Sequence, residues 1–167
     1  MGKWPVALQA RESGRSRLAV AVPRASAGVL VLDETHQALL ALPGSVLTHV
    51  EGPIHYLDLG ACKAHSLADF GGADELLAGV TKLYACHSGL RYLEGLQRLR
   101  NLRWLYLDHN ELGEAELLRL PELLPAGVQL EALDVRGNPG CSPGVEAELA
   151  SSRLLQHAEY LNGRRLE

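Results

Sequence analysis

The chain has 167 residues, a formal net charge of −4 at neutral pH and 5% aromatic residues, and 34 of its residues are leucine. A chain of this length is expected to form one domain with its own hydrophobic core. Because it contains one Phe and one Met, that core must be built from branched aliphatic side chains. The composition therefore favours a core of repeated leucine positions over the irregular core of an enzyme.

The same numbers exclude several classes of function. No apolar run approaches the roughly 20 residues that a membrane-spanning helix requires. The negative charge provides no basic field for a nucleic-acid backbone, and residues 54–167 alone carry 11 basic and 16 acidic residues. Three widely spaced cysteines match neither a disulfide framework nor a CxxC metal motif. We therefore expect a reducing, cytoplasmic environment.

Residues 1–26 are expected to form an N-terminal extension or cap. Two apolar runs, 18–22 and 29–32, flank a turn region and predict a β-hairpin joined to the repeats that follow. Residues 1–24 carry five basic residues and one acid. Pro5 and Gly14 interrupt any long amphipathic helix there, so we expect no transit peptide.

A repeated pattern occupies residues 27–140. Residues 102–112 fit LxxLxLxxNxL at every fixed position, and weaker copies begin at residues 27, 54, 80 and 130. The spacings between these starts are 27, 26, 22 and 28 residues, within the range of about 20–29 typical of leucine-rich repeats. The ninth position is always a small polar residue or Cys: Thr35, Cys62, Ser88, Asn110 and Asn138. Such a side chain can satisfy backbone groups inside the turn that ends each strand.

Each repeat predicts one short parallel strand and one return segment. Residues 67–79 predict a return with a helical turn, and residues 114–124 predict a helix disturbed near Pro121. The 22-residue repeat is too short for a full helix, so its return should be 3₁₀-like. Residues 141–167 are expected to cap the last repeat, with a helix over 143–155 and a turn at residues 162–163.

These motifs resemble the leucine-rich repeat superfamily. The similarity rests on residues 102–112 and on the tail at 155–163, and it covers roughly residues 27–167. The small intracellular branch is most similar; it includes short-repeat phosphatase regulators, the spliceosomal A-prime protein and the leucine-rich dynein light chain of axonemes. The resemblance implies an α/β solenoid with about five parallel strands on a concave face and helical or 3₁₀ convex returns. It also implies a cytoplasmic, ciliary or nuclear assembly as the setting.

Strand alternation places the third, fifth and seventh positions of each repeat on the concave face. Four of the eight aromatic residues fall there, although the core does not need them. Tyr and Trp are enriched at binding hot spots, so we expect a protein-binding surface, the alternative being that the rings only shield the sheet. The candidate partner-binding residues are Tyr56, Asp58, Lys82, Tyr84, Trp104, Tyr106, Asp108, Asp134 and Arg136.

A second constellation consists of Cys86, His87, Asp108 and His109. Because the two histidines share the eighth position of consecutive repeats, their side chains should approach one another. They suit zinc by type, but the usual ligand spacings are absent, and two histidines on a solvated ridge are common. We therefore assign no metal and no cofactor. An acidic edge at residues 108–122 is either a solvated face or a docking site for a basic partner.

No hydrolase, P-loop, dinucleotide or zinc-protease motif is present. The sequence thus predicts a non-catalytic adaptor or structural subunit that binds a partner protein inside a larger assembly, without direct contact to nucleic acid, membrane or small substrate. The alternative is an enzyme-associated metal or thiol site on the ridge formed by Cys86, His87 and His109.

Overall fold

The computed structural model describes residues 54–60, 66, 68 and 74–166, and the backbone of three short strands before them. Its main feature is an open, mixed sheet of seven strands in the order β3-β4-β5-β6-β7-β8-β9. Neighbours are parallel from β3 to β8, and β9 is antiparallel to β8. The strands are β3 (Val29–Val31), β4 (Tyr56–Asp58), β5 (Lys82–Tyr84), β6 (Trp104–Tyr106), β7 (Ala132–Asp134), β8 (Tyr160–Leu161) and β9 (Arg164–Arg165).

The predicted strand positions are confirmed, and the register follows the sequence frame. The fourth position of each repeat pairs with the same position of the next, from Leu30 through Leu57, Leu83 and Leu105 to Leu133. The expected number of about five parallel strands is too low, because Leu161 of β8 continues this row. The tail therefore adds a sixth parallel strand instead of only a turn.

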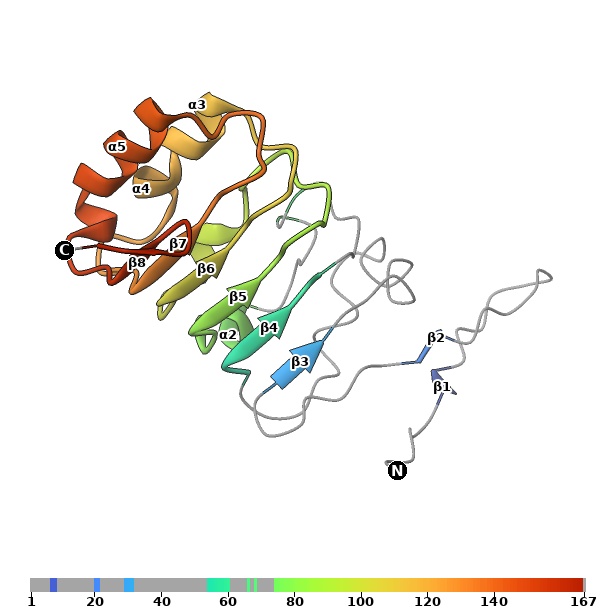
Figure 1. The fold of residues 1–167 in the computed structure, drawn as a ribbon. Helices are drawn as coiled ribbons and strands as arrows, with labels where there is room; N and C mark the ends of the chain where they lie inside the picture. Colours follow the sequence, from blue (N-terminus) through green and yellow to red (C-terminus); the bar gives the residue numbers. More distant parts are fainter. Residues whose placement is uncertain are drawn as a thin grey trace.

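The core lies between the sheet and the return segments, which cover one side of the sheet (Figure 1). The first, fourth and sixth positions of the four described repeats are all buried, as the alternation of a strand requires. Leu105 and Leu107 of the best-matching repeat are fully buried. Among the described residues, no Phe or Trp belongs to this core, and branched aliphatics fill it as the composition predicted.

The return segments have the predicted character. Helix α2 covers Asp74–Ala78, and the short repeat returns through the 3₁₀ turn η4 (Leu96–Arg98). The next return is split into α3 (Glu114–Leu118) and α4 (Leu120–Leu123). The break falls where predicted because Pro121 has no N–H to donate to the preceding turn. Residues 67 and 70, which were also expected in the first return, lie outside the described residues.

The C-terminal cap is helical but is not one helix. Helix α5 covers Pro143–Ser151, and η5 covers Arg153–Leu155. The predicted continuous helix over 143–155 is wrong at Ser152, whose ψ of 158° is extended and whose hydroxyl donates to the Leu149 carbonyl at 2.7 Å. The expected apolar face is confirmed, since Val145, Leu149 and Leu154 are buried.

A tight hairpin closes the chain. Asn162 and Gly163 have φ values of 53° and 71°, the two positive values that a two-residue type I′ turn requires. Asn162 also fixes the hairpin to the sheet, because its side-chain oxygen accepts the N–H of Val135 at 2.9 Å. The predicted turn is therefore confirmed and joins β8 to β9.

The predicted N-terminal hairpin is paired differently. Strand β2 (Val20–Ala21) pairs with β1 (Ala7–Leu8) in a separate two-stranded sheet. Strand β3 instead joins the large sheet, in parallel with β4. The expected pairing of 18–22 with 29–32 is wrong because residues 29–31 occupy the third to fifth positions of the repeat frame. The rest of the 1–26 extension lies outside the described residues.

The ninth position performs the predicted task. Asn110 is buried, accepts the N–H groups of Ser88 and Leu90 at 2.9 and 3.1 Å, and donates to the carbonyls of Ala85 and Leu107 at 2.7 and 2.8 Å. Asn138 makes a similar set of contacts one repeat later. These side chains connect each turn to the turn before it. Cys62 lies outside the described residues.

Candidate functional site

The side of the sheet opposite the helices carries all nine predicted partner-binding residues; we call it the open face. The strand register puts Tyr56, Lys82 and Trp104 in one row and Asp58, Tyr84, Tyr106 and Asp134 in the next. Six of these seven are half-buried, as is Asp108. Asp134 is buried, and Arg136 is exposed. The structure thus gathers the candidates on one face but exposes them to different degrees.

The aromatic residues of the open face contact one another. The Tyr84 and Tyr106 ring centroids are 5.7 Å apart with their planes at 42°. Lys82 Nζ lies 5.4 Å from the Tyr56 ring centroid and 5.1 Å from that of Tyr106, within the range of about 6 Å for a cation–π contact. The rings therefore shield each other in part, yet they keep solvent-facing surface.

The three tyrosines of this cluster remain neutral well above physiological pH. Burial and the neighbouring Asp58 carboxylate raise the pKa of Tyr56, whose hydroxyl lies 3.4 Å from Asp58 Oδ2. A hydrogen bond with the Cys86 thiol, together with repulsion from the Cys86 thiolate, raises the pKa of Tyr84 to about 12. Burial and Asp134 raise the pKa of Tyr106. Neutral phenols suit a surface that packs against a partner and supplies hydrogen bonds.

Asp134 and Arg136 form a closed pair at the C-terminal end of the face. Arg136 Nη2 lies 2.5 Å from Asp134 Oδ2, and its Nε lies 3.0 Å from Oδ1. The Asp134 carboxylate also accepts the Arg136 backbone N–H at 3.1 Å. Since Asp134 is buried and fully engaged, its charge is directed at Arg136 and not at solvent.

The predicted ridge assembles at the strand ends, where the two histidine rings stack with centroids 4.5 Å apart and planes at 14°. Asp108 bridges the neighbours, with Oδ1 2.6 Å from Cys86 Sγ and Oδ2 2.9 Å from His109 Nδ1. Ligand atoms of His87, Asp108 and His109 all lie within 4.8 Å of one another. Parallel rings direct their in-plane lone pairs side by side, so one shared ion requires a ring to turn.

Cys86 lies beside the open-face residue Asp108, but it is not exposed. The seventh position was expected on the concave face; there the thiol is buried and forms hydrogen bonds with the Asp108 and Tyr84 side chains. Burial and the hydrogen bond to Asp108 raise the pKa of Cys86 to about 12. Burial alone would raise the pKa of Asp108, but hydrogen bonds from Cys86 and His109 outweigh it and lower that pKa. A protonated thiol is a poor nucleophile and metal ligand near neutral pH.

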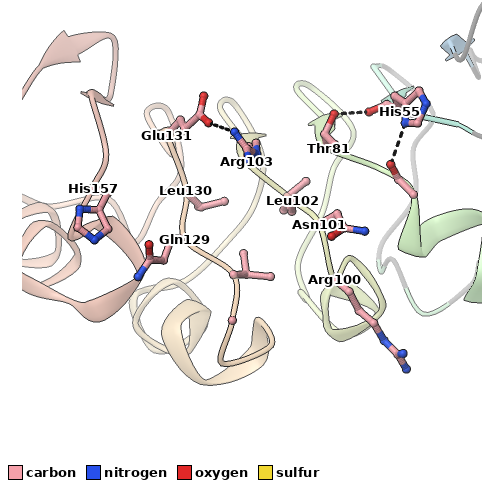
Figure 2. A pocket seen from close by; sticks show the side chains of 13 residues that line it. His55, Thr81, Arg100, Asn101, Leu102, Arg103, Gln129, Leu130, Glu131 and His157 are labelled. Atoms are coloured by element: carbon pink, nitrogen blue, oxygen red, sulfur yellow. Dashed lines mark hydrogen bonds and ion pairs between the residues drawn. The ribbon is translucent and has the colours of Figure 1, made fainter.

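A hollow of about 590 Å³ lies at the starts of the strands (Figure 2). Its polar groups largely bind one another. Thr81 donates to the His55 carbonyl at 3.1 Å, and His55 Nδ1 lies 3.2 Å from the Gly79 carbonyl. Arg103 pairs with Glu131 here at 2.5 Å. The Arg103 and Glu131 charges offset one another, which leaves Arg100 as the remaining cation among the residues that line this hollow.

The acidic edge is also partly neutralised. Glu111 lies 2.6 Å from Arg91, and Glu116 lies 3.0 Å from Arg119 while accepting the Leu93 backbone N–H at 2.9 Å. These contacts favour its interpretation as a solvated, internally paired edge.

Sequence reasoning missed a smaller hollow on the open face. It has a volume of about 280 Å³ and is lined by Trp104, Tyr106, Ala132, Leu133, Asp134, Tyr160 and Gly163. Tyr160 is one of two large hydrophobic residues that are exposed in the described part of the chain. The sequence did contain a signal for Tyr160. Residues 158–161 fit the first four positions of the repeat pattern, which places Tyr160 at the third position.

Searches against known protein families and against curated proteins find no match for this chain. Among the described residues, no helix has the length and apolar character needed to cross a membrane. The functional interpretation therefore rests on the geometry of the open face.

Proposed function

We propose that this chain is a leucine-rich repeat protein that binds a partner protein through its open face, as a non-catalytic adaptor or structural subunit. In this proposal the sheet is the concave side of a solenoid, the return segments are its convex side, and residues 141–167 are its C-terminal cap. The leading observation is the half-exposed group of Tyr56, Tyr84, Trp104 and Tyr106, which the core does not use.

The chemistry of the face supports this proposal. Large rings with few rotatable bonds bury much area for little loss of conformational entropy, which explains their enrichment at binding hot spots. Lys82, held between Tyr56 and Tyr106, adds a charge whose direction is fixed before binding. A sheet with every strand paired to its neighbours provides a rigid base, so little ordering is required when a partner binds. The unpaired thiols Cys86 and Cys141 fit a reducing, cytoplasmic setting.

The test is a double substitution, Trp104→Ala with Tyr106→Ala, in affinity purification followed by mass spectrometry. Each truncation of a hot-spot ring is expected to cost about 2 kcal/mol or more, so the double variant should lose its specific partners. Exposed Tyr92, substituted by Ala, is the matched control because it lies outside the open-face frame. A double variant that is folded and retains every partner would overturn the proposal.

A metal site on the ridge is the second candidate, and it rests on the grouping of His87, Asp108 and His109. These residues supply zinc-compatible ligand types, and rotation of one histidine ring would let both reach one ion. Zinc titration by calorimetry, compared between the wild type and His87→Ala with His109→Ala, decides the matter. Stoichiometric binding that the double variant loses would support the site, and no saturable heat in the wild type would contradict it.

A further inference from the structure

The 280 Å³ hollow exists because one row of the open face has a gap. The third-position row runs Tyr56, Lys82, Trp104, Ala132 and Tyr160 across neighbouring strands. Ala132 is the only small residue in this described row, and it stands between two aromatic residues. Since adjacent strands lie about 4.8 Å apart, the backbones under Trp104 and Tyr160 are separated by roughly 10 Å. That spacing leaves room for one flat group between the two rings.

The size and lining of this hollow fit a side chain better than a free ligand. Pockets that bury drug-sized molecules typically measure about 300–1,000 Å³, and this one, at about 280 Å³, is smaller. Three aromatic residues, Trp104, Tyr106 and Tyr160, line it, and the only carboxylate among its lining residues is that of Asp134. Aromatic rings in contact prefer offset or edge-to-face geometry, which adjacent walls of this kind offer to an incoming ring.

The charge around the hollow is positive. A Cβ at Gly163 would lie 3.2 Å from Arg136 Nη2, so the Arg136 guanidinium lies over the hairpin turn beside the hollow. Arg164 and Arg165 are exposed, and neither side chain has an ion pair with another residue in the described part of the chain. Arg165 lies opposite Tyr160 in the hairpin and so extends the third-position row. Arg136 and Asp134 neutralise one another, so the charge left beside Tyr160 on the open face is that of Arg165, whereas Arg164 lies opposite the buried Leu161 on the other face.

From this arrangement we infer that the hollow receives a single aromatic side chain from an acidic segment of the partner protein. The ring enters between Trp104 and Tyr160 above Ala132, and an acidic neighbour on the segment meets Arg165, the hairpin arginine that lies opposite Tyr160. A cationic side chain would gain from the aromatic walls but would face the Arg165 guanidinium. Charge therefore selects an acidic segment, and the shape of the hollow selects a ring.

This inference rests on the proposed function and specifies the chemistry of the partner. The direct test measures fluorescence anisotropy of labelled pentapeptides with the full chain. The probe has a central tryptophan flanked on each side by two glutamates; one comparison peptide replaces the tryptophan by alanine, and another replaces the glutamates by lysines. We expect saturable binding of the first peptide and at least about tenfold weaker binding of both others.

Two variants assign the binding to the hollow. Ala132→Leu fills the gap from its base and should weaken the tryptophan peptide at least about tenfold, whereas Tyr92→Ala, an exposed position outside the open face, should bind as the wild type does. Tyr160→Ala removes an exposed wall and serves as a second variant if Ala132→Leu does not fold. Equal affinity of the alanine and tryptophan peptides, stronger binding of the lysine peptide, or no saturable binding up to about 1 mM would overturn the inference.

The same variants separate this inference from the proposed function. If Trp104→Ala with Tyr106→Ala loses the cellular partners while Ala132→Leu retains them, the open face binds but the hollow does not receive the anchor. If neither variant loses the partners, both proposals fail. Loss of the partners by both variants, together with the expected peptide ranking, supports both.

Discussion

The two sides of the same strands differ in what they require of their residues. On the helix-covered side, the four described repeats carry only Leu, Ile, Val or Ala at the inward positions, and all of them are buried. On the open face, adjacent positions carry Tyr, Trp, Lys, Asp, Cys, Ala and Arg with exposures that range from buried to exposed. One side uses a single kind of side chain repeatedly, and the other uses a different one at nearly every place. Stability therefore depends on one set of alternate residues of each strand, and the other set carries the proposed binding surface.

The sharpest way to break this comparison is to truncate two neighbours on β6. Leu105→Ala removes a fully buried side chain from the middle of the core and should lower the free energy of unfolding by about 4 kcal/mol. Trp104→Ala, one residue away, removes a half-buried ring and should cost about 1 kcal/mol. Urea denaturation followed by circular dichroism measures both. Equal losses would show that the open face is as much a part of the core as the leucine row.

The close packing on the helix-covered side is tested by two glycines. A Cβ at Gly140 would lie 2.1 Å from the Glu114 backbone nitrogen, whereas a Cβ at Gly113 would meet nothing within 4 Å. Gly140→Ala should therefore force α3 to move and cost about 3 kcal/mol, with Gly113→Ala within about 0.5 kcal/mol of the wild type. Thermal unfolding of the two variants checks this. A Gly140→Ala protein as stable as Gly113→Ala would contradict close contact between α3 and the turn that follows β7.

The hydrogen bonds by which Asn110 connects successive turns should make an intermediate contribution to stability. Asn110→Ala leaves the buried N–H groups of Ser88 and Leu90 without their acceptor and should cost about 2 kcal/mol. Asn101, which is exposed and donates once to the Ala78 carbonyl, is the matched control. Its alanine variant should change stability by less than about 0.5 kcal/mol. Comparable losses for the two variants would show that the Asn110 hydrogen bonds stabilise the fold no more than a surface hydrogen bond does.

The next prediction concerns the reactivity of Cys86, which is buried although it lies on the open face. Because burial and Asp108 raise its pKa to about 12, it should react with alkylating agents far more slowly at neutral pH than a free cysteine does. Mass spectrometry after timed alkylation separates Cys86 from the other cysteines. Reaction at the rate of a model thiol would contradict the burial and reopen the ridge as a reactive site.

The same shift predicts a pH dependence with a definite sign. A thiol whose pKa is raised on folding stabilises the native state fully below its unfolded value, and this contribution is lost as the pH rises through the folded value. Stability should therefore fall between about pH 9 and pH 12. Cys86→Ser should flatten this fall in part, and Tyr84, whose pKa is also raised to about 12, contributes to the remainder. An unchanged profile in Cys86→Ser would assign the loss to other groups.

Local sequence pattern predicted what depends on neighbours along the chain. The period of two within each strand determined which residues enter the core, and the repeat spacing determined which residues lie side by side, such as His87 and His109. Pro121 marked the break between α3 and α4 because the missing N–H is a property of that residue alone. The interruption at Ser152 was not predicted, because the flanking residues carry the same apolar spacing on both sides of it.

The sequence by itself determined the parallel strands, their register, the leucine core and the polar turn residues, because each of these follows from a short period repeated along the chain. Only the tertiary structure decided how the ends pair: β2 pairs with β1, and β8 lies parallel to β7 at the end of the leucine row. It alone also decided that Cys86 is buried and that Ala132 leaves a hollow between Trp104 and Tyr160. The physical reason is that pairing partners and the size of a gap depend on side chains that meet across strands some 25 residues apart in the chain.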